Sequence, residues 1–340
     1  MQLVLVGTAH IEQRGDQVVL AHQRDHRLDV QIPRKGNRPR LAVLGGSSVR
    51  RGPGPGTASD FPTRLAELLP DVEVLNLGSP GQSMGGVAKI LGELGPVQAD
   101  RVLLYEGHND FAQVVFMGGV YAAPLWQLPF YALTGRSWIY LTVKHLVLPV
   151  PPDTSGMTSA SRLLVTADRT ALDAREQVLD LYEQALKDAV DQSPAPVIFS
   201  TMLRNFDAPP TGVLVEGDAA ACSALLRKPD LVLAEVEASC GKGSLSEWLA
   251  AQQADREGKK EEALAHWRRS LALDPLPIRA PLEADDRIRA VQGATVVDPA
   301  TALGPLPRGP LFSDVLHPST EGALALAQVL APAVRQSLGR

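Results

Sequence analysis

The sequence is poor in cysteine, with Cys222 and Cys240 as its two examples in 340 residues. They form no C-x-x-C pair and no histidine pair lies near them, which argues against a zinc site. We expect two buried free thiols. A disulfide linking neighbouring helices is the alternative in an oxidising compartment, and the sequence alone does not decide between the two.

Long apolar runs and an excess of basic residues are also absent. No run approaches the roughly 18 apolar residues of a membrane helix, and the start, MQLVLVGTAHIEQRGDQ, lacks the regions of a secretory signal. The net charge of −5 argues against the basic surface that nucleic acids require. We expect a soluble protein without nucleic-acid partners or an integral membrane segment. It is cytoplasmic by default, and periplasmic if an upstream signal or anchor is missing from this sequence.

Short apolar runs alternate with helix-like segments from residue 41 onward. Fully apolar strands between amphipathic helices are typical of a parallel sheet covered on both faces, which predicts a three-layer α/β/α fold of about five strands. Ligands of such sheets bind beyond the carboxyl ends of the strands. The runs are LAVLGG (41–46), VEVLNLG (72–78), RVLLYEG (101–107), PVIFSTM (196–202) and ATVVDPA (294–300).

The rest of the chain divides into an extension and two inserts. Residues 1–39 alternate apolar and polar side chains around Arg-Gly-Asp, which predicts a β-hairpin extension before a main domain of 40–340. Residues 111–157 form an aromatic helical insert that serves as extra core, or else as a lid or acyl-binding wall. Residues 211–275 form a helical insert that contains half of a tetratricopeptide-like repeat, a structural element that could also contact a protein. The repeat positions are Gly258, Ala263, Trp267 and Pro275.

Polar residues directly after the strands suggest a catalytic site. Ser47 follows the first strand in GGSS, and the late pair Asp314 and His317 could activate its hydroxyl, since a histidine base needs an orienting acid. The backbone N–H groups of Ser47 and Gly81 and the side chain of Asn109 would then bind the oxyanion. Taken singly, each feature has an ordinary interpretation as a loop, a turn or a helix cap. Their joint occurrence after successive strands favours catalysis.

These motifs resemble the SGNH (GDSL-type) hydrolase superfamily. The four blocks of that family correspond here to Gly45-Gly46-Ser47, Gly81 in NLGSPG, GHND at 107–110 and Asp314–His317. The first block departs from the family, because Gly46 replaces the usual aspartate and the glycine expected four residues past the serine comes one residue late. The shift makes Ser48 an alternative nucleophile. Ser47 is favoured because the strand LAVL followed by Gly-Gly-Ser keeps the family's spacing between the strand and the serine. NFDAPP and the half-repeat resemble a bacterial subgroup with tetratricopeptide-like insertions.

The resemblance implies a flavodoxin-like fold and an ester hydrolase. It implies cleavage of a small-molecule carboxylic ester through an acyl-enzyme at Ser47, with no metal and no organic cofactor. Two alternatives remain open at this point. One is acyl or acetyl transfer to a sugar or peptide hydroxyl, which the same triad would serve, and the other is a non-catalytic binding module.

Overall fold

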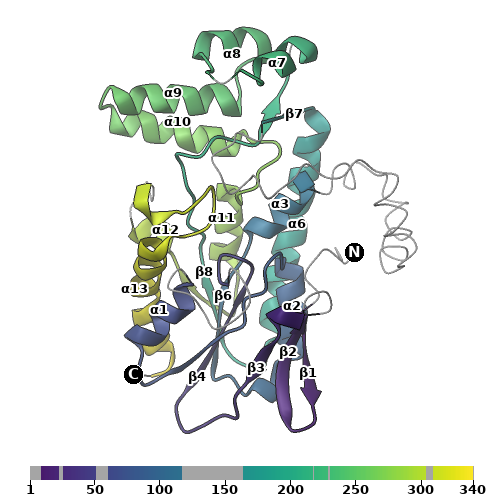
Figure 1. Ribbon diagram of the computed structural model, residues 1–340, viewed down its shortest axis with the longest axis vertical. Helices are drawn as coiled ribbons and strands as arrows, with labels where there is room; N and C mark the ends of the chain where they lie inside the picture. Colours follow the sequence, from purple (N-terminus) through teal and green to yellow (C-terminus); the bar gives the residue numbers. More distant parts are fainter. Residues whose placement is uncertain are drawn as a thin grey trace, which may run out of the picture. The chain divides into compact units, whose positions relative to one another are not determined.

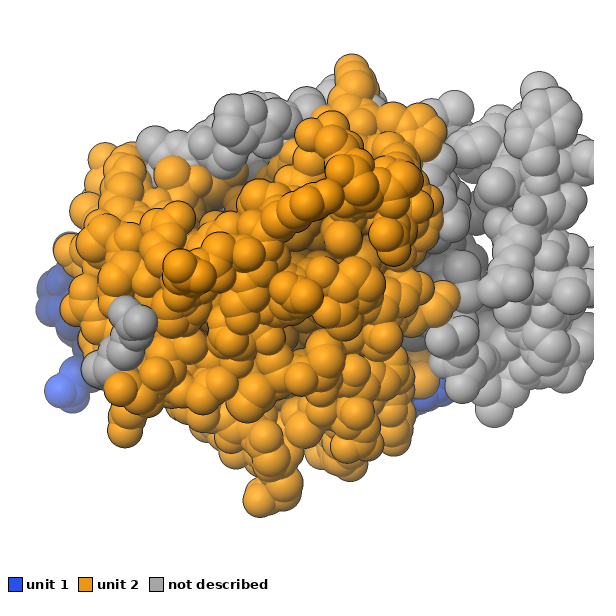
Figure 2. Space-filling model, turned by 90° about the horizontal axis from the view of Figure 1, so that it is seen from below, with its two compact units in different colours: residues 1–4, 111–178, 206–282 blue, residues 5–110, 179–205, 283–340 orange. Residues whose placement is uncertain are grey.

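The structure of the chain, a computed structural model, divides into two compact units that are coloured separately in Figure 2. The larger unit contains residues 5–110, 179–205 and 283–340, and the smaller contains 1–4, 111–178 and 206–282. Most of the predicted aromatic insert lies outside the described residues. Those residues are 9–22, 26–50, 60–116 (backbone alone for 113–116), 164–216, 218–228, 230–303 and 309–339.

A five-stranded parallel sheet forms the centre of the larger unit, with the strand order β10-β8-β6-β4-β5. Numbered along the chain, this order is 2-1-3-4-5, the flavodoxin-like arrangement. The predicted fold class and strand number are therefore confirmed. The register pairs Gly45 with Tyr105, so the loops after β4 and β6 begin side by side. The strands are β4 (Arg40–Gly45), β5 (Glu73–Asn76), β6 (Arg101–Tyr105), β8 (Val197–Ser200) and β10 (Thr295–Val297).

Helices cover both faces of this sheet (Figure 1). On one face, α1 (Phe61–Leu68) and α13 (Thr320–Ser337) pack apolar side chains onto alternate strand residues, which forms a buried cluster. On the other face lie α2 (Met84–Gly92) and the second half of α6 (Arg169–Gln192). Ser319 caps α13, because its hydroxyl accepts the Gly322 N–H at 3.1 Å. The larger unit also contains the start of α3 (His108–Phe116), up to residue 110, and α11 (Leu282–Ala290) from residue 283. It further contains α12 (Pro299–Ala302) and the short 3₁₀ helices Gly95–Val97 and Gly309–Leu311.

A small antiparallel sheet precedes the central one. The expected hairpin consists of β1 (Ala9–Arg14) and β2 (Gln17–His22), and a third strand, β3 (Val30–Ile32), pairs with β2. A 3₁₀ turn at His26–Leu28 lies between β2 and β3. The His22 imidazole nitrogen Nε2 lies 3.0 Å from the Ser79 hydroxyl. This buried contact connects the small sheet to the loop that follows β5.

The smaller unit is mainly helical. It contains a two-stranded parallel sheet, β7 (Val165–Ala167) with β9 (Gly212–Leu214), and a helical hairpin of α9 (Ser244–Arg256) and α10 (Lys260–Ala272). Gly258 has φ +78° in the turn of the hairpin. Ala263 and Trp267 are buried on the inner side of α10, which accounts for their spacing; the likeness to a tetratricopeptide repeat stays a prediction. No helix in the described ranges is both long and apolar enough to cross a bilayer.

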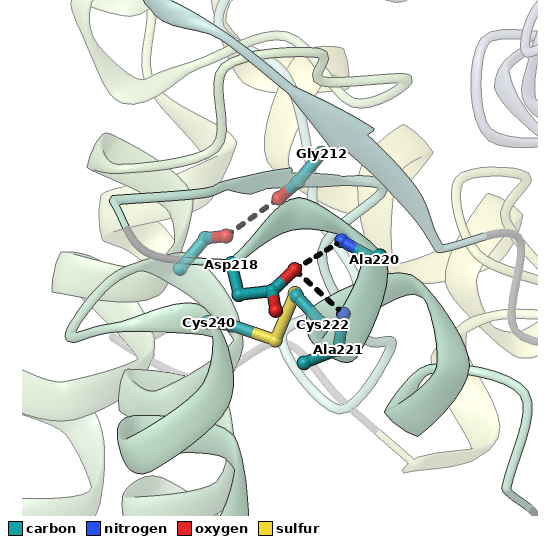
Figure 3. Close-up of a disulfide and its surroundings, with 7 residues drawn as sticks. Gly212, Asp218, Ala220, Ala221, Cys222 and Cys240 are labelled. Carbon is teal, nitrogen blue, oxygen red and sulfur yellow. Dashed lines mark hydrogen bonds between the residues drawn. A yellow bond between two sulfur atoms is a disulfide. The ribbon is translucent and has the colours of Figure 1, made fainter.

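Cys222 and Cys240 form a disulfide between α7 (Ala219–Leu225) and α8 (Leu233–Cys240), shown in Figure 3. Both residues are buried, as expected, but the expectation of free thiols is wrong. The reason is that α8 runs back along α7, which brings its last residue beside Cys222 at a Cα–Cα distance of 4.9 Å. Asp218 caps α7 by accepting the N–H groups of Ala220 and Ala221.

Candidate active site

The side chains of Ser47, His317 and Asp314 are joined in one hydrogen-bonded chain. His317 Nε2 lies 2.8 Å from Ser47 Oγ, and its Nδ1 lies 2.7 Å from Asp314 Oδ2. The second carboxylate oxygen, Oδ1, accepts the N–H groups of Leu316 and His317 at 3.0 and 2.8 Å. The sequence motif D-x-x-H thus folds into a turn in which the acid holds both the backbone and the ring of the histidine.

The environment of Asp314 keeps its carboxylate charged. Burial by itself raises the pKa of Asp314, but the hydrogen bond and charge of His317 outweigh burial and lower this pKa to about 2. The Asp314 backbone carbonyl also accepts the Asn205 side-chain N–H at 3.0 Å. Asn205 belongs to NFDAPP, which follows β8, so a second strand end supports the acid. The sequence singled out this segment without giving Asn205 a role.

The hydroxyl that is hydrogen-bonded to the imidazole belongs to Ser47, one of the two candidate serines. β4 ends at Gly45, and the N–H groups of Val49 and Arg50 both donate to the Gly46 carbonyl. The chain therefore turns sharply at Ser47 and presents this side chain beyond the strand end. Positions 51 and 52, where the motif departs from the family spacing, lie outside the described residues.

The predicted oxyanion donors come from three neighbouring loops. Gly81 has φ +77°, a left-handed conformation that glycine adopts without strain, in the turn between β5 and α2. The Asn109 side-chain nitrogen Nδ2 donates to the Gln82 carbonyl at 2.8 Å, one residue beyond Gly81. An amide nitrogen carries two protons, so this bond uses one of them. The structure brings Asn109 to the Gly81 loop, and the donor roles remain predictions.

Gly46, which stands where the family usually has aspartate, lies directly beneath Asn109. A Cβ atom at position 46 would come within 2.0 Å of Asn109 Nδ2 and 2.6 Å of Glu106 Oε2. Both distances are far below van der Waals contact. A side chain at position 46 would therefore fit only if the ends of the Asn109 and Glu106 side chains moved away, and Gly46 allows their close approach.

Two acids, the buried Glu106 and the part-buried Asp110, lie on either side of Asn109 in the sequence. Both Asp110 oxygens accept the Met84 N–H at the start of α2, at 3.0 and 3.2 Å. Burial raises the pKa of Asp110 to about 7. Burial and the nearby Asp110 charge raise the pKa of Glu106 well above its ordinary value. Neither acid was predicted to have a role, although Glu106 directly follows a strand, as the other candidate residues do.

Among comparisons with known proteins, matches were found with solved structures alone. No family model matches the chain, and no curated protein matches it. Solved structures that match include an extracellular lipase from Streptomyces rimosus, at 15% identity and a TM-score of 0.37, covering 87% of this chain and 99% of the lipase.

Two further matches have similar coverage. Phospholipase A1 from Streptomyces albidoflavus is 12% identical with a TM-score of 0.34 and covers 88% of this chain and 99% of its own. A lipolytic protein of the G-D-S-L family from Desulfitobacterium hafniense is 12% identical with a TM-score of 0.36, covering 87% and 99%. The chain is similar to these proteins in fold, and its strand order is the one that the SGNH resemblance implies.

Proposed function

We propose that the protein is a serine hydrolase that cleaves small carboxylic esters through an acyl-enzyme at Ser47. The observation that carries the proposal is the position of His317, whose two ring nitrogens bridge Ser47 Oγ and Asp314 Oδ2 at 2.8 and 2.7 Å. In this arrangement a histidine can take the serine proton while a charged acid holds the ring in the required tautomer. A binding module has no need of that arrangement.

The acylation half-reaction uses the triad as follows. Ser47 Oγ attacks the ester carbonyl carbon as its proton passes to His317 Nε2, and the carbonyl oxygen becomes an oxyanion. Asn109 Nδ2 and the N–H groups of Ser47 and Gly81 stabilise this oxyanion. The imidazolium then gives its proton to the departing alkoxide, which leaves as the alcohol, and the acyl group remains on Ser47.

Deacylation repeats the same proton transfers with a new nucleophile. A water gives a proton to His317 Nε2 and attacks the acyl carbon, and the proton returns to Ser47 Oγ as the acid leaves. If a sugar or peptide hydroxyl took the place of water, the same residues would transfer the acyl group. The distinction lies in the acceptor, so a product assay is needed to separate the two.

Hydrolysis of p-nitrophenyl acetate and butyrate by the purified full chain tests the proposal. We expect release of p-nitrophenol with saturation kinetics, and loss of this activity in Ser47→Ala. Adding an excess of a sugar or serine-containing peptide should leave free acid as the main product; an acylated acceptor would instead indicate a transferase. Equal rates for the wild type and Ser47→Ala would rule out the proposed nucleophile.

A further inference from the structure

Glu106 stands at the carboxyl end of the central strand β6 with its side chain turned back toward two loops. The residue is 6% exposed. Its Oε1 accepts the Gly107 N–H at 2.9 Å and the Asn109 N–H at 3.4 Å. Its other oxygen, Oε2, faces Gly46, because a Cβ atom at position 46 would lie 2.6 Å from it, and the backbone N–H of Gly46 acts to lower the Glu106 pKa. One side chain therefore connects the residue before Ser47 with the backbone of Asn109.

The contact between these loops leaves no free space. The position that a Cβ on Gly46 would take is 2.6 Å from Glu106 Oε2 and 2.0 Å from Asn109 Nδ2. The register of the sheet adds to this alignment, because Gly45 and Tyr105 are paired residues of β4 and β6. The Glu106 carbonyl in turn accepts the Tyr182 hydroxyl at 2.7 Å, which anchors the residue from α6. The carboxylate thus lies at the point where the nucleophile loop and the amide loop touch.

A buried carboxyl group is costly in free energy, and burial beside Asp110 raises the pKa of Glu106 well above its usual range. The triad does not use this group, since Asp314 already orients His317. A buried carboxyl group that accepts the backbone N–H groups of Gly107 and Asn109 and packs against Gly46 is suited to holding these groups in one arrangement. The loops it holds carry the proposed nucleophile and a proposed oxyanion donor.

We infer that Glu106 is a positioning residue, which sets the distance between Ser47 and the Asn109 amide by packing its Oε2 against Gly46 while its Oε1 accepts the Asn109 N–H. The inference rests on the proposed ester hydrolase function. Glu106 itself would not touch the substrate. It would act on the rate of the chemical step through Asn109, because the oxyanion that Asn109 stabilises exists only after attack.

Kinetics of Glu106→Gln on p-nitrophenyl acetate test the inference. A carboxyl group can accept through both of its oxygens whether or not it carries a proton, whereas glutamine keeps the side-chain volume but replaces one of these oxygens with an NH₂ group that cannot accept. We expect kcat to fall by about tenfold or more with KM changed less than about twofold, as befits an interaction made in the transition state. Glu106→Asp is the second variant, because it keeps the acid but shortens the side chain by one methylene, and we expect a similar fall.

A double-mutant cycle with Asn109→Ala separates positioning from general support of the fold. If Glu106 acts through Asn109, Glu106→Gln should cost less than about twofold in kcat once Asn109 is already alanine. Glu73→Gln is the matched control. It removes a carboxylate from the buried Arg40 at the amino ends of β4 and β5, and we expect kcat to be unchanged at a temperature where the variant is folded.

Each outcome decides the matter. An unchanged kcat in both folded Glu106 variants, or an equal loss with and without the Asn109 side chain, would overturn the positioning role while leaving the hydrolase intact. If Glu106→Gln does not fold, Glu106→Asp supplies the same comparison, and failure of both to fold would assign Glu106 to stability instead. Wild-type hydrolysis that does not depend on Ser47 would mark failure of the proposed function, and the inference would fall with it.

Discussion

His317 Nε2 and Ser47 Oγ lie 2.8 Å apart although 270 residues separate them in the chain. The contact depends on the parallel sheet. Ser47 lies just beyond the carboxyl end of β4, and the turn before α13 places His317 at the same edge of the sheet. The contact also distinguishes between the two candidate serines. If the bond is the one used in catalysis, the two serines must respond differently to substitution.

Ser47→Ala should therefore abolish hydrolysis of p-nitrophenyl esters, by on the order of 10³-fold or more in kcat. Ser48→Ala should keep most of the activity and serves as the matched control. Initial rates over a range of substrate concentrations measure both. A Ser48→Ala enzyme that loses as much activity as Ser47→Ala would transfer the nucleophile role to the second serine.

Asp314→Asn should reduce kcat on the order of 10⁴-fold, since an amide stabilises the wrong imidazole tautomer and cannot balance the imidazolium charge. The low pKa of Asp314, about 2, arises because the hydrogen bond and charge of His317 outweigh burial. The carboxylate should thus remain ionised throughout the neutral range. Asp298→Asn, which alters a cap on α12, is the control. Retention of more than a tenth of wild-type kcat in Asp314→Asn would contradict the assigned orientation role.

The positions of most of the candidate site residues could be predicted from the sequence, for a physical reason. The apolar runs that form β4, β5 and β6 end where glycine or a polar residue follows, so Ser47, Gly81 and Asn109 could be placed at one edge of a sheet before any distance was known. The D-x-x-H turn and the Ser319 cap are local features, and local hydrogen bonding is readable from adjacent residues.

What the sequence did not indicate depends on long-range packing. The role of Gly46 follows from the approach of Glu106 and Asn109, which lie some 60 residues later in the sequence. Asn205 and Asp314 are likewise brought together by the fold, 109 residues apart. Strand β3 has three residues, and its pairing with β2 makes a three-stranded sheet where the sequence predicted a hairpin. The pairing of Cys222 with Cys240 depends on α8 running back along α7, which residues close in the sequence do not reveal.

The stability of the larger unit should fall as pH rises between about 4 and 7, and Asp110 should contribute to this fall. Burial raises the folded-state pKa of Asp110 to about 7, whereas an unfolded aspartate has a value near 3.9. In this pH window the unfolded chain has released the proton and the folded chain still holds it, so raising the pH favours unfolding.

The measurement compares the free energy of unfolding in urea at pH 5 and pH 7.5. Asp110→Asn should lose less stability than the wild type between these values. Asp16→Asn, at an exposed turn, should behave as the wild type does. A pH dependence that Asp110→Asn leaves unaltered would show that Asp110 is ionised in the folded protein.

Because of the disulfide, we expect the stability of the smaller unit to depend on whether Cys222 and Cys240 are oxidised or reduced. Closing a loop across a separation of 18 residues stabilises the folded state by about 3 kcal/mol in the chain-entropy model. Cys222→Ser, and the wild type under reducing conditions, should therefore lower the thermal stability of this unit to a similar extent. Alkylation before and after reduction, read by intact mass, reports the bond directly; two thiols alkylated in the oxidised, unfolded protein would contradict it.

The central claim is that Ser47 is a nucleophile activated by His317, and labelling with a fluorophosphonate tests it most directly. The reagent forms a covalent adduct with an activated serine, and peptide mass spectrometry identifies the residue. We predict a single adduct on Ser47 in the wild type, and its loss in Ser47→Ala and His317→Ala but not in Ser48→Ala. An adduct on another residue, or labelling of Ser47 that is as fast without His317, would contradict the account.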